Sequence, residues 1–179
     1  MAETGTPLPP PASDEEMRKL LKPNPTVDQL TDVIKLNYTE PGSSTKVVIV
    51  KQLDSYDDVN YLVTLDDVKY LVKVHNGVES REYITSRRQN LHKSCIELST
   101  AIIHHLHSHS IPVNVPYENY DIALANLPVL SAAHSPQRLA VRLLHWVPGV
   151  PLSSLSNASV EVVAEAGALL GRVCVALDG

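Results

Sequence analysis

The chain has 179 residues, of which 44% are hydrophobic and 20% charged, and its formal net charge at pH 7 is −5. This composition is typical of a soluble globular protein, and the negative charge argues against a general binder of nucleic acid or of anionic membranes. The two cysteines, Cys95 and Cys174, form no CxxC pair, so we expect neither a disulfide framework nor a cysteine zinc site. No apolar run approaches the length of a membrane span, and the first residues do not resemble a signal peptide. We therefore expect a cytosolic protein.

The first predicted elements are a tail and a short helix. Residues 1–25 are rich in proline and small polar residues, which predicts a disordered tail with a short helix around Met17 to Leu21. Thr26 and Gln29 have the spacing of a capping box. Apolar residues at helical spacing then predict a helix that runs to about Leu36.

Three short strands are predicted next. The segments 46–53, 59–65 and 69–75 are rich in valine and tyrosine, and Asp66-Asp67 has the chemistry of a hairpin turn. Strands linked this tightly should pair antiparallel as a meander.

The second half of the chain alternates helices and strands. Apolar residues at steps of four and three predict a helix of about four turns that ends before Ile111-Pro112; they are Leu91, Cys95, Leu98, Ile102 and Leu106. Strands are expected over 122–127 and 138–146, followed by a turn at Pro148-Gly149. A last helix begins near Ser159, with an apolar face formed by Val160, Val163, Leu170, Cys174 and Leu177. On these patterns both cysteines are predicted to be core thiols.

Lys73 is the first residue that suggests a site. It lies between apolar residues in the run 70–74, and burying an ammonium group is costly unless an anion meets it. Such a lysine on a strand is typical of kinase-like proteins, where the ammonium binds nucleotide phosphates. The alternative is a solvated lysine on an edge strand.

Four segments in one order resemble the hydroxylysine kinase family, which belongs to the aminoglycoside-phosphotransferase-like branch of the protein-kinase-like fold. They are the SYDDVNYLV run at 55–63, the YLVKV run at 70–74, the helix with Glu97 that leads to Pro112, and the VRLL run at 141–144 that leads to Pro148-Gly149. The resemblance covers about residues 26–178 and implies a tail (1–25), a small nucleotide-binding lobe (26–146) and a hinge with the start of a larger lobe (147–179). The implied fold is α+β, with an antiparallel sheet of about five strands and one long helix, plus the first helix of the second lobe.

The resemblance also implies a function: transfer of the γ-phosphoryl group of GTP or ATP, with Mg²⁺, to the hydroxyl of 5-hydroxylysine or a similar amino alcohol. Ser55, Tyr56, Asp57 and Asn60 would form the loop beside the phosphates. Lys73 would hold phosphate oxygens, with Glu97 orienting it. Leu71 would belong to the nucleotide site, and the backbone of the segment Leu144, His145 and Trp146 would meet the purine.

Three features depart from a simple kinase pattern. The loop 55–60 contains no glycine, and its aspartates could equally be turn formers. Glu97 lies off the apolar stripe of its helix and could be solvated. No H-G-D-x-x-x-x-N segment precedes Gly179, so we expect the catalytic aspartate and the acceptor site beyond it, and no transfer by this chain alone. The alternative function is a non-catalytic kinase-like remnant that binds a partner through the last helix.

A histidine cluster provides the other candidate site. His105 and His109 have the spacing of a metal pair, with His104 and His107 beside them. No third ligand follows at a diagnostic distance, and histidines are favoured at a helix C-terminus, so we expect solvated histidines and no metal site.

Overall fold

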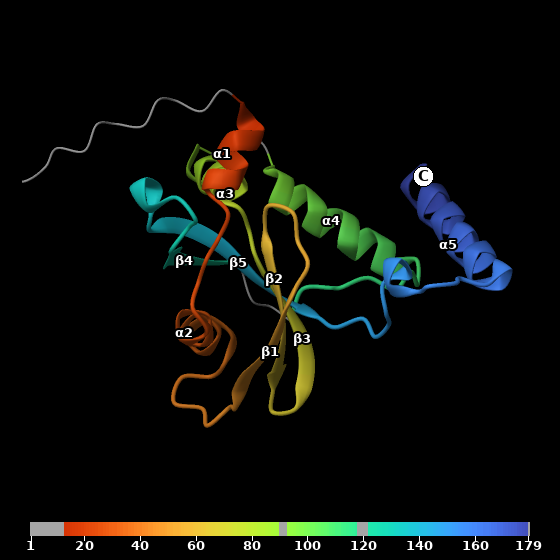
Figure 1. The fold of residues 1–179 in the computed structure, drawn as a ribbon, viewed down its shortest axis with the longest axis horizontal. Helices are drawn as coiled ribbons and strands as arrows, with labels where there is room; N and C mark the ends of the chain where they lie inside the picture. Colours follow the sequence, from red (N-terminus) through yellow and green to blue (C-terminus); the bar gives the residue numbers. More distant parts are fainter. Residues whose placement is uncertain (1–12, 90–92, 118–121, 179) are drawn as a thin grey trace, which may run out of the picture.

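The computed structural model describes residues 13–89, 93–117 and 122–178. Within this part of the chain, five strands form one antiparallel sheet with helices on both faces (Figure 1). The strands are β1 (Val47–Leu53), β2 (Val59–Leu65), β3 (Val68–Val74), β4 (Ala123–Leu127) and β5 (Gln137–His145). The helices are α1 (Asp14–Leu20), α2 (Val27–Tyr38), α3 (Gly77–Gln89), α4 (Cys95–Ser108) and α5 (Val160–Asp178), with 3-10 turns at Ala132–His134 and Leu152–Ser154. The predicted α+β class and the five-stranded antiparallel sheet are confirmed.

The strand order β1-β2-β3-β5-β4 places β3 at the centre of the sheet. The predicted meander is present, and its β2–β3 turn consists of Asp66 and Asp67, with φ of 46° and 68°. Aspartate tolerates this left-handed region better than most residues, and the Asp66 carboxylate also accepts a hydrogen bond from the backbone N–H of Lys46 at 2.8 Å. Because β3 is central, Lys73 is not on an edge strand, and that alternative is wrong.

One face of the sheet packs on α2 and forms the main core. Leu30, Ile34 and Tyr38 of α2 are buried together with Val72 of β3 and Val141 of β5. The predicted capping box is confirmed at the start of α2, where the Thr26 hydroxyl accepts from the N–H of Gln29 and the Gln29 side chain accepts from the N–H of Thr26. Burial of this stripe is what fixes the side of the sheet on which α2 lies.

The opposite face is covered by α3 and α4. Tyr83 and Ile96 form a small core with Ala140 of β5, and the Ser80 hydroxyl accepts from the N–H of Ala140 at 2.9 Å. The sequence analysis missed α3, because its buried face consists mainly of small polar residues instead of an apolar stripe. In α4, Ile96 is buried while Leu98, Ile102 and Cys95 are exposed, which corrects the predicted core stripe. Leu91 lies outside the described residues.

The prediction of a disordered tail is corrected for residues 13–25, while the short helix predicted within it is present. These residues contain α1, and Leu21 after it is fully buried. Leu21 accepts the N–H of Gly77 at 3.1 Å, and an isolated bridge joins Pro23 to Val129. This segment is therefore packed against the sheet and α3. Residues 1–12 of the predicted tail lie outside the described residues.

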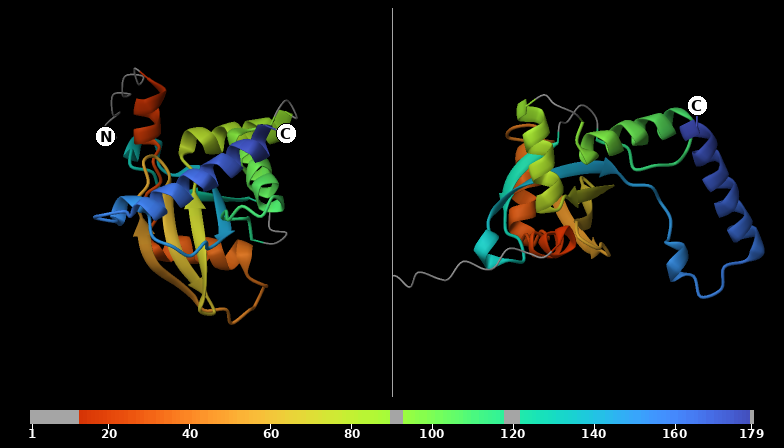
Figure 2. Two further views of the ribbon diagram at one scale, coloured as in Figure 1. Left: turned by 90° about the vertical axis from the view of Figure 1, so that its right-hand side faces the viewer. Right: turned by 90° about the horizontal axis from the view of Figure 1, so that it is seen from above.

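The last helix, α5, stands apart from the sheet and contacts the C-terminal end of α4 (Figure 2). Ala176 is buried there against Leu106 and Ile111. The predicted apolar face is the exposed one: Val160 is 80% exposed and Leu170 63%, and Cys174 is exposed instead of being a core thiol. No helix within the described ranges has the length and apolar character needed to cross a bilayer.

Candidate functional site

Lys73 lies in a row of polar side chains that crosses the middle of the sheet. In register, Asn60 of β2 pairs with Lys73, and Lys73 pairs with Arg142 of β5. Directly opposite residues of neighbouring strands share a face, so all three side chains lie on the face that α3 and α4 partly cover. The Oδ1 atom of Asn60 is buried without a hydrogen-bond partner.

A row of leucines runs beside the polar row. Leu62, Leu71 and Leu144 are in register across β2, β3 and β5, on the same face as Lys73. Leu62 and Leu144 are buried, and Leu71 is half-buried. In the described part of the chain they join neither the core under α2 nor the core under α3. Of the three, Leu71 is the one that offers partly exposed apolar surface next to the cation, which suits a ligand with a flat apolar part and an anionic part.

The ion partner of Lys73 is Asp58. The ammonium Nζ contacts Asp58 Oδ2, and the Asp58 side chain is only 8% exposed. Asp58 Oδ1 also accepts the backbone N–H of Asn76 at 2.8 Å. Asp58 is therefore anchored where β2 begins and β3 ends, and it holds Lys73 from that side.

Glu97 does not hold Lys73 in this structure, which corrects the predicted pairing. Its carboxylate accepts the backbone N–H and the hydroxyl of Ser94, both at 2.9 Å, and completes a capping box at the start of α4. These hydrogen bonds with Ser94 lower the pKa of Glu97. Glu97 thus stabilises the helix end, a local interaction that competes with any long-range pairing.

The loop before β2 is held by α1 and by Lys22, which follows that helix. Asp57 forms an ion pair with Arg18 at 2.9 Å, and the Lys22 ammonium donates to the carbonyls of Ser55 and Tyr56 at 2.8 Å each. The predicted phosphate-side loop is present, but the Asp57 carboxylate is directed to Arg18 and the Tyr56 hydroxyl to a glutamate of α1. Cations on α1 and at position 22 therefore fix the shape of this loop.

The predicted purine-facing segment is already engaged on its main chain. The N–H of His145 donates to the carbonyl of Val115 at 2.8 Å, and the carbonyl of His145 accepts the side-chain N–H of Asn114 at 2.9 Å. The His145 ring lies 5.6 Å from the ring of Tyr70. The N–H of His145 is thus not available to a purine, and the next residue along the chain, Trp146, is half-buried.

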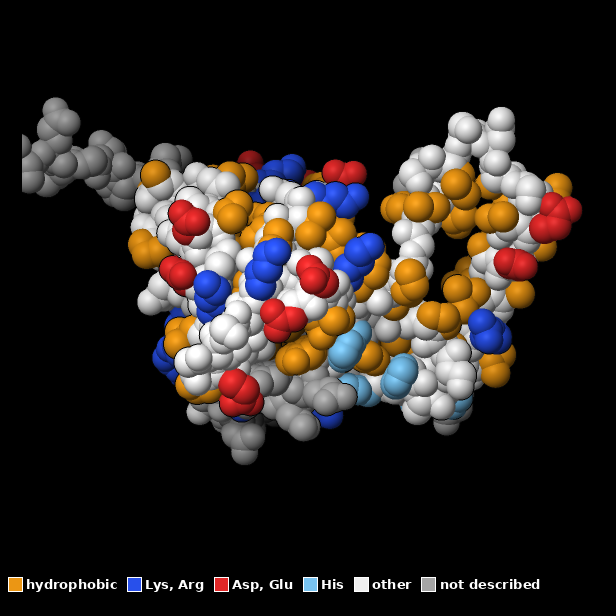
Figure 3. All heavy atoms as spheres, turned by 90° about the horizontal axis from the view of Figure 1, so that it is seen from below, with side chains coloured by type: hydrophobic (Ala, Val, Ile, Leu, Met, Phe, Trp, Pro, Cys, Tyr) orange, Lys and Arg blue, Asp and Glu red, His pale blue; other side chains and the backbone are white. Residues whose placement is uncertain are grey.

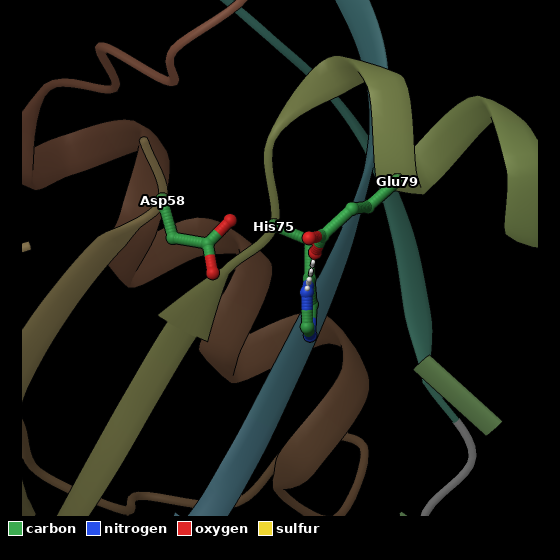
Figure 4. A group of neighbouring side chains, drawn as sticks. All are labelled: Asp58, His75 and Glu79. Atoms are coloured by element: carbon green, nitrogen blue, oxygen red, sulfur yellow. Dashed lines mark hydrogen bonds and ion pairs between the residues drawn. The ribbon is translucent and has the colours of Figure 1, made fainter. Parts of the chain in front are cut away.

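A buried group of titratable side chains lies where β3 leads into α3. Asp58, His75 and Glu79 come close together there (Figure 4). Hydrogen bonds from His75 and Arg18 lower the pKa of Glu79 to about 2, while burial lowers the pKa of His75. Glu79 is therefore an acceptor, and the Nδ1–H of a neutral His75 donates to it at 3.0 Å.

This group does not fit the Mg²⁺ ion that a nucleotide would bring. Asp58 already holds Lys73, and Glu79 already holds Arg18 at 3.1 Å, so each carboxylate has a cation of its own. Mg²⁺ prefers oxygen ligands, and the third member of the group is an imidazole.

In the histidine cluster, the ring nitrogens of His105 and His109 contact backbone carbonyl oxygens at 2.7 and 2.9 Å.

One sequence comparison supports the resemblance found in the sequence. No protein-family model matches the chain. A curated relative, hydroxylysine kinase of Xenopus laevis, is 26% identical over 153 residues, which are 85% of this chain and 38% of the relative. A solved structure, a candidate aminoglycoside phosphotransferase from Ralstonia eutropha JMP134, has a TM-score of 0.40 at 17% identity and matches 79% of this chain and 34% of its own. The chain therefore spans little more than a third of these proteins.

The sequence similarity confirms the predicted resemblance to hydroxylysine kinases and supports a place in the kinase-like superfamily. Two residues of the site were missed by sequence reasoning. Asp58 was considered as part of the loop 55–60 but not as the ion partner of Lys73, and Arg142 was noted only as part of the VRLL run. A charged residue enclosed by five apolar ones, as Arg142 is in LAVRLLHW, is the signal that could have identified it.

Proposed function

We propose that this chain is the nucleotide-binding part of a small-molecule kinase of the hydroxylysine kinase type. The observation that carries the proposal is a lysine on the central strand, fixed by a buried aspartate and flanked by a leucine strip on the same face. Lys73 would bind phosphate oxygens of GTP or ATP, and Leu71 would contact the purine. Asp58 would position Lys73.

The donor, the acceptor and the location of the protein are parts of the same proposal. GTP or ATP with Mg²⁺ would supply the phosphoryl group, and the hydroxyl of 5-hydroxylysine or a similar amino alcohol would accept it. Residues 26–146 would form the small lobe and 147–179 the hinge with the start of a second lobe. The cytosolic location remains a prediction from the sequence.

Nucleotide binding by the chain is the direct test. Fluorescent GTP and ATP analogues are titrated into the chain and into two variants on one strand, Lys73→Met and Lys69→Met. Both lysines lie on the same face of β3, but Lys69 is exposed near the β2–β3 turn. Loss of a charge-assisted hydrogen bond should weaken binding about 10- to 100-fold in Lys73→Met and leave it unchanged in Lys69→Met.

Two outcomes would contradict the proposal: no saturable binding of either nucleotide, or equal affinity of the chain and Lys73→Met. Circular dichroism shows whether Lys73→Met is folded, and Lys73→Arg, which keeps the charge, provides a second variant. Phosphoryl transfer from labelled GTP to 5-hydroxylysine is measured with the product of the complete coding sequence. The difference between GTP and ATP in both assays identifies the donor.

A second function is favoured by the exposed face of α5. Val160, Val163, Leu170 and Leu177 are all at least half exposed, and large exposed apolar surfaces are typical of interaction sites. A non-catalytic kinase-like module would bind a partner through this face. That function predicts no nucleotide binding, so the titration above distinguishes the two.

A further inference from the structure

A pocket of about 1100 Å³ lies between α4 and the end of β5. Side chains of α3 and α4, the segment 115–117 and β5 line it. The segment 115–117 pairs with β5 on the side opposite to β3, because Tyr117 donates to the carbonyl of Leu143 and His145 donates to Val115. Neither Lys73 nor Leu71 is among the described residues that line the pocket.

Arg142 lines this pocket and is a buried cation without a carboxylate partner among the described residues. Its exposed fraction is 5%. One guanidinium nitrogen, Nη1, donates to the Ser99 hydroxyl at 3.3 Å, while the other, Nη2, is buried and has no hydrogen-bond partner in the described part of the chain. Among the described residues, no carboxylate lies within ion-pair distance of Arg142.

Ser99 presents Arg142 in a defined geometry. Its hydroxyl donates to the carbonyl of Ile96 at 2.9 Å, which leaves a lone pair that accepts from Arg142. A guanidinium group cannot shed its proton to escape burial, so an unpaired one costs several kcal/mol. A protein that retains such a group needs a compensating anion, and the unused Nη2 shows where that anion would bind.

The charges around the pocket also favour an anion. The described residues that line it include three permanent cations, Arg87, Lys93 and Arg142, and one carboxylate, Glu97. That carboxylate is directed to Ser94. His104, His107 and His145 line the pocket as well, and Figure 3 shows histidine side chains gathered between the body of the molecule and the arm formed by α5.

We infer that this pocket is a binding site for a small oxyanion, a phosphate or carboxylate group, held by the Nη2 of Arg142. The inference does not depend on the proposed nucleotide site. Arg142 is the register partner of Lys73, so the two sites are neighbours, and the control substitution is made at a lysine outside both.

The test follows the side-chain Nε–Hε signal of Arg142 by NMR while inorganic phosphate, and separately acetate, is added to the chain. We expect the signal to shift and to saturate as anion is added. In Arg142→Met, where the titration is read from the signals of neighbouring residues, the anion affinity should be about 10- to 100-fold weaker. Lys69→Met is the matched control, since Lys69 is exposed and is not among the described residues that line the pocket, and it should leave the phosphate affinity unchanged. A shift with phosphate alone identifies a phosphate site, and a shift with both anions identifies a general oxyanion site.

A thermal measurement separates a ligand-binding arginine from a structural one. In anion-free buffer, Arg142→Met should melt at the same or a higher temperature than the chain, because the unpaired charge is gone and the apolar stem is kept. Phosphate should raise the melting temperature of the chain and not that of the variant. The inference is overturned if neither anion shifts Arg142, if Arg142→Met binds phosphate equally well, or if the variant melts lower and phosphate stabilises neither protein.

Discussion

The ion pair between Lys73 and Asp58 should stabilise the fold asymmetrically. The Lys73 side chain is 29% exposed, whereas that of Asp58 is 8% exposed. Without Asp58 the ammonium can reach water, but without Lys73 the carboxylate stays buried with one backbone N–H, that of Asn76. Removing one partner of a buried pair costs about 3–5 kcal/mol in general. Because this pair is partly exposed at Lys73, we expect about 2–3 kcal/mol for Lys73→Met and about 1 kcal/mol for Asp58→Asn.

Urea unfolding followed by circular dichroism measures both costs at pH 7, with equal m-values as the check that the denatured states match. The double variant Asp58→Asn/Lys73→Met should be less destabilised than the sum of the two single variants by about 1–2 kcal/mol. Glu15→Gln is the control, since it breaks an ion pair with Lys19 in which both side chains are at least 60% exposed, and it should change nothing measurable. Additive single effects, or an Asp58→Asn cost larger than that of Lys73→Met, would refute the reasoning.

Three further predictions concern stability. Gly77→Ala should cost about 1–3 kcal/mol because its new Cβ would lie 2.9 Å from the Cβ of Leu21, whereas Gly167→Ala in α5, with no atom within 4 Å, should be neutral or stabilising in the same urea assay. Folding lowers the pKa of Glu79 from 4.5 to about 2, so its ionised side chain should contribute up to roughly 3 kcal/mol to the free energy of unfolding above pH 4.5. This contribution should be lost as the pH falls from 4.5 to 2. The free energies of unfolding of the chain and of Glu79→Gln should therefore converge over that pH range and differ by a constant amount above it. Asp67→Gly should raise the melting temperature slightly or leave it unchanged, because φ at this turn is 68°, and a clear loss would show that the aspartate side chain supports the turn.

The strands could be predicted closely because their signals are local. Alternating apolar residues and the Asp66-Asp67 turn placed β2 and β3 within one residue of their observed ends. The capping box at Thr26 likewise depends on residues three positions apart, and it is present as predicted. Such signals survive folding because the interactions they describe are made within one hairpin or one helical turn.

The helix α3 could not be predicted from the sequence because the buried face of this helix has little apolar character. Gly77, Ser80, Tyr83 and Ser86 lie three residues apart and are all buried against the sheet and its neighbours. Small residues permit a close approach, and the Ser80 hydroxyl replaces apolar contact with a hydrogen bond to Ala140. A search for small residues at this spacing would have found the helix.

The partner of Lys73 was predicted wrongly for a different reason. Glu97 was selected by its place in a family pattern, yet Ser94, three residues before it, forms a capping box with it. Asp58 reaches Lys73 through the pairing of β2 with β3, a contact that depends on strand register. Long-range pairing of this kind is not encoded in the residues next to either partner.

The anchoring of the loop 54–58 by the N-terminal segment bears on how shortened versions of this protein are made. A shortened chain that begins at residue 26, as the proline-rich composition before it suggests, would lack Arg18 and Lys22. It would therefore lose the ion pair with Asp57 and the hydrogen bonds to the carbonyls of Ser55 and Tyr56. It would also lack Leu21, which fills the space over Gly77. A shortened chain whose first residue is Ser13 or an earlier one keeps these contacts and leaves the surroundings of Asp58 intact.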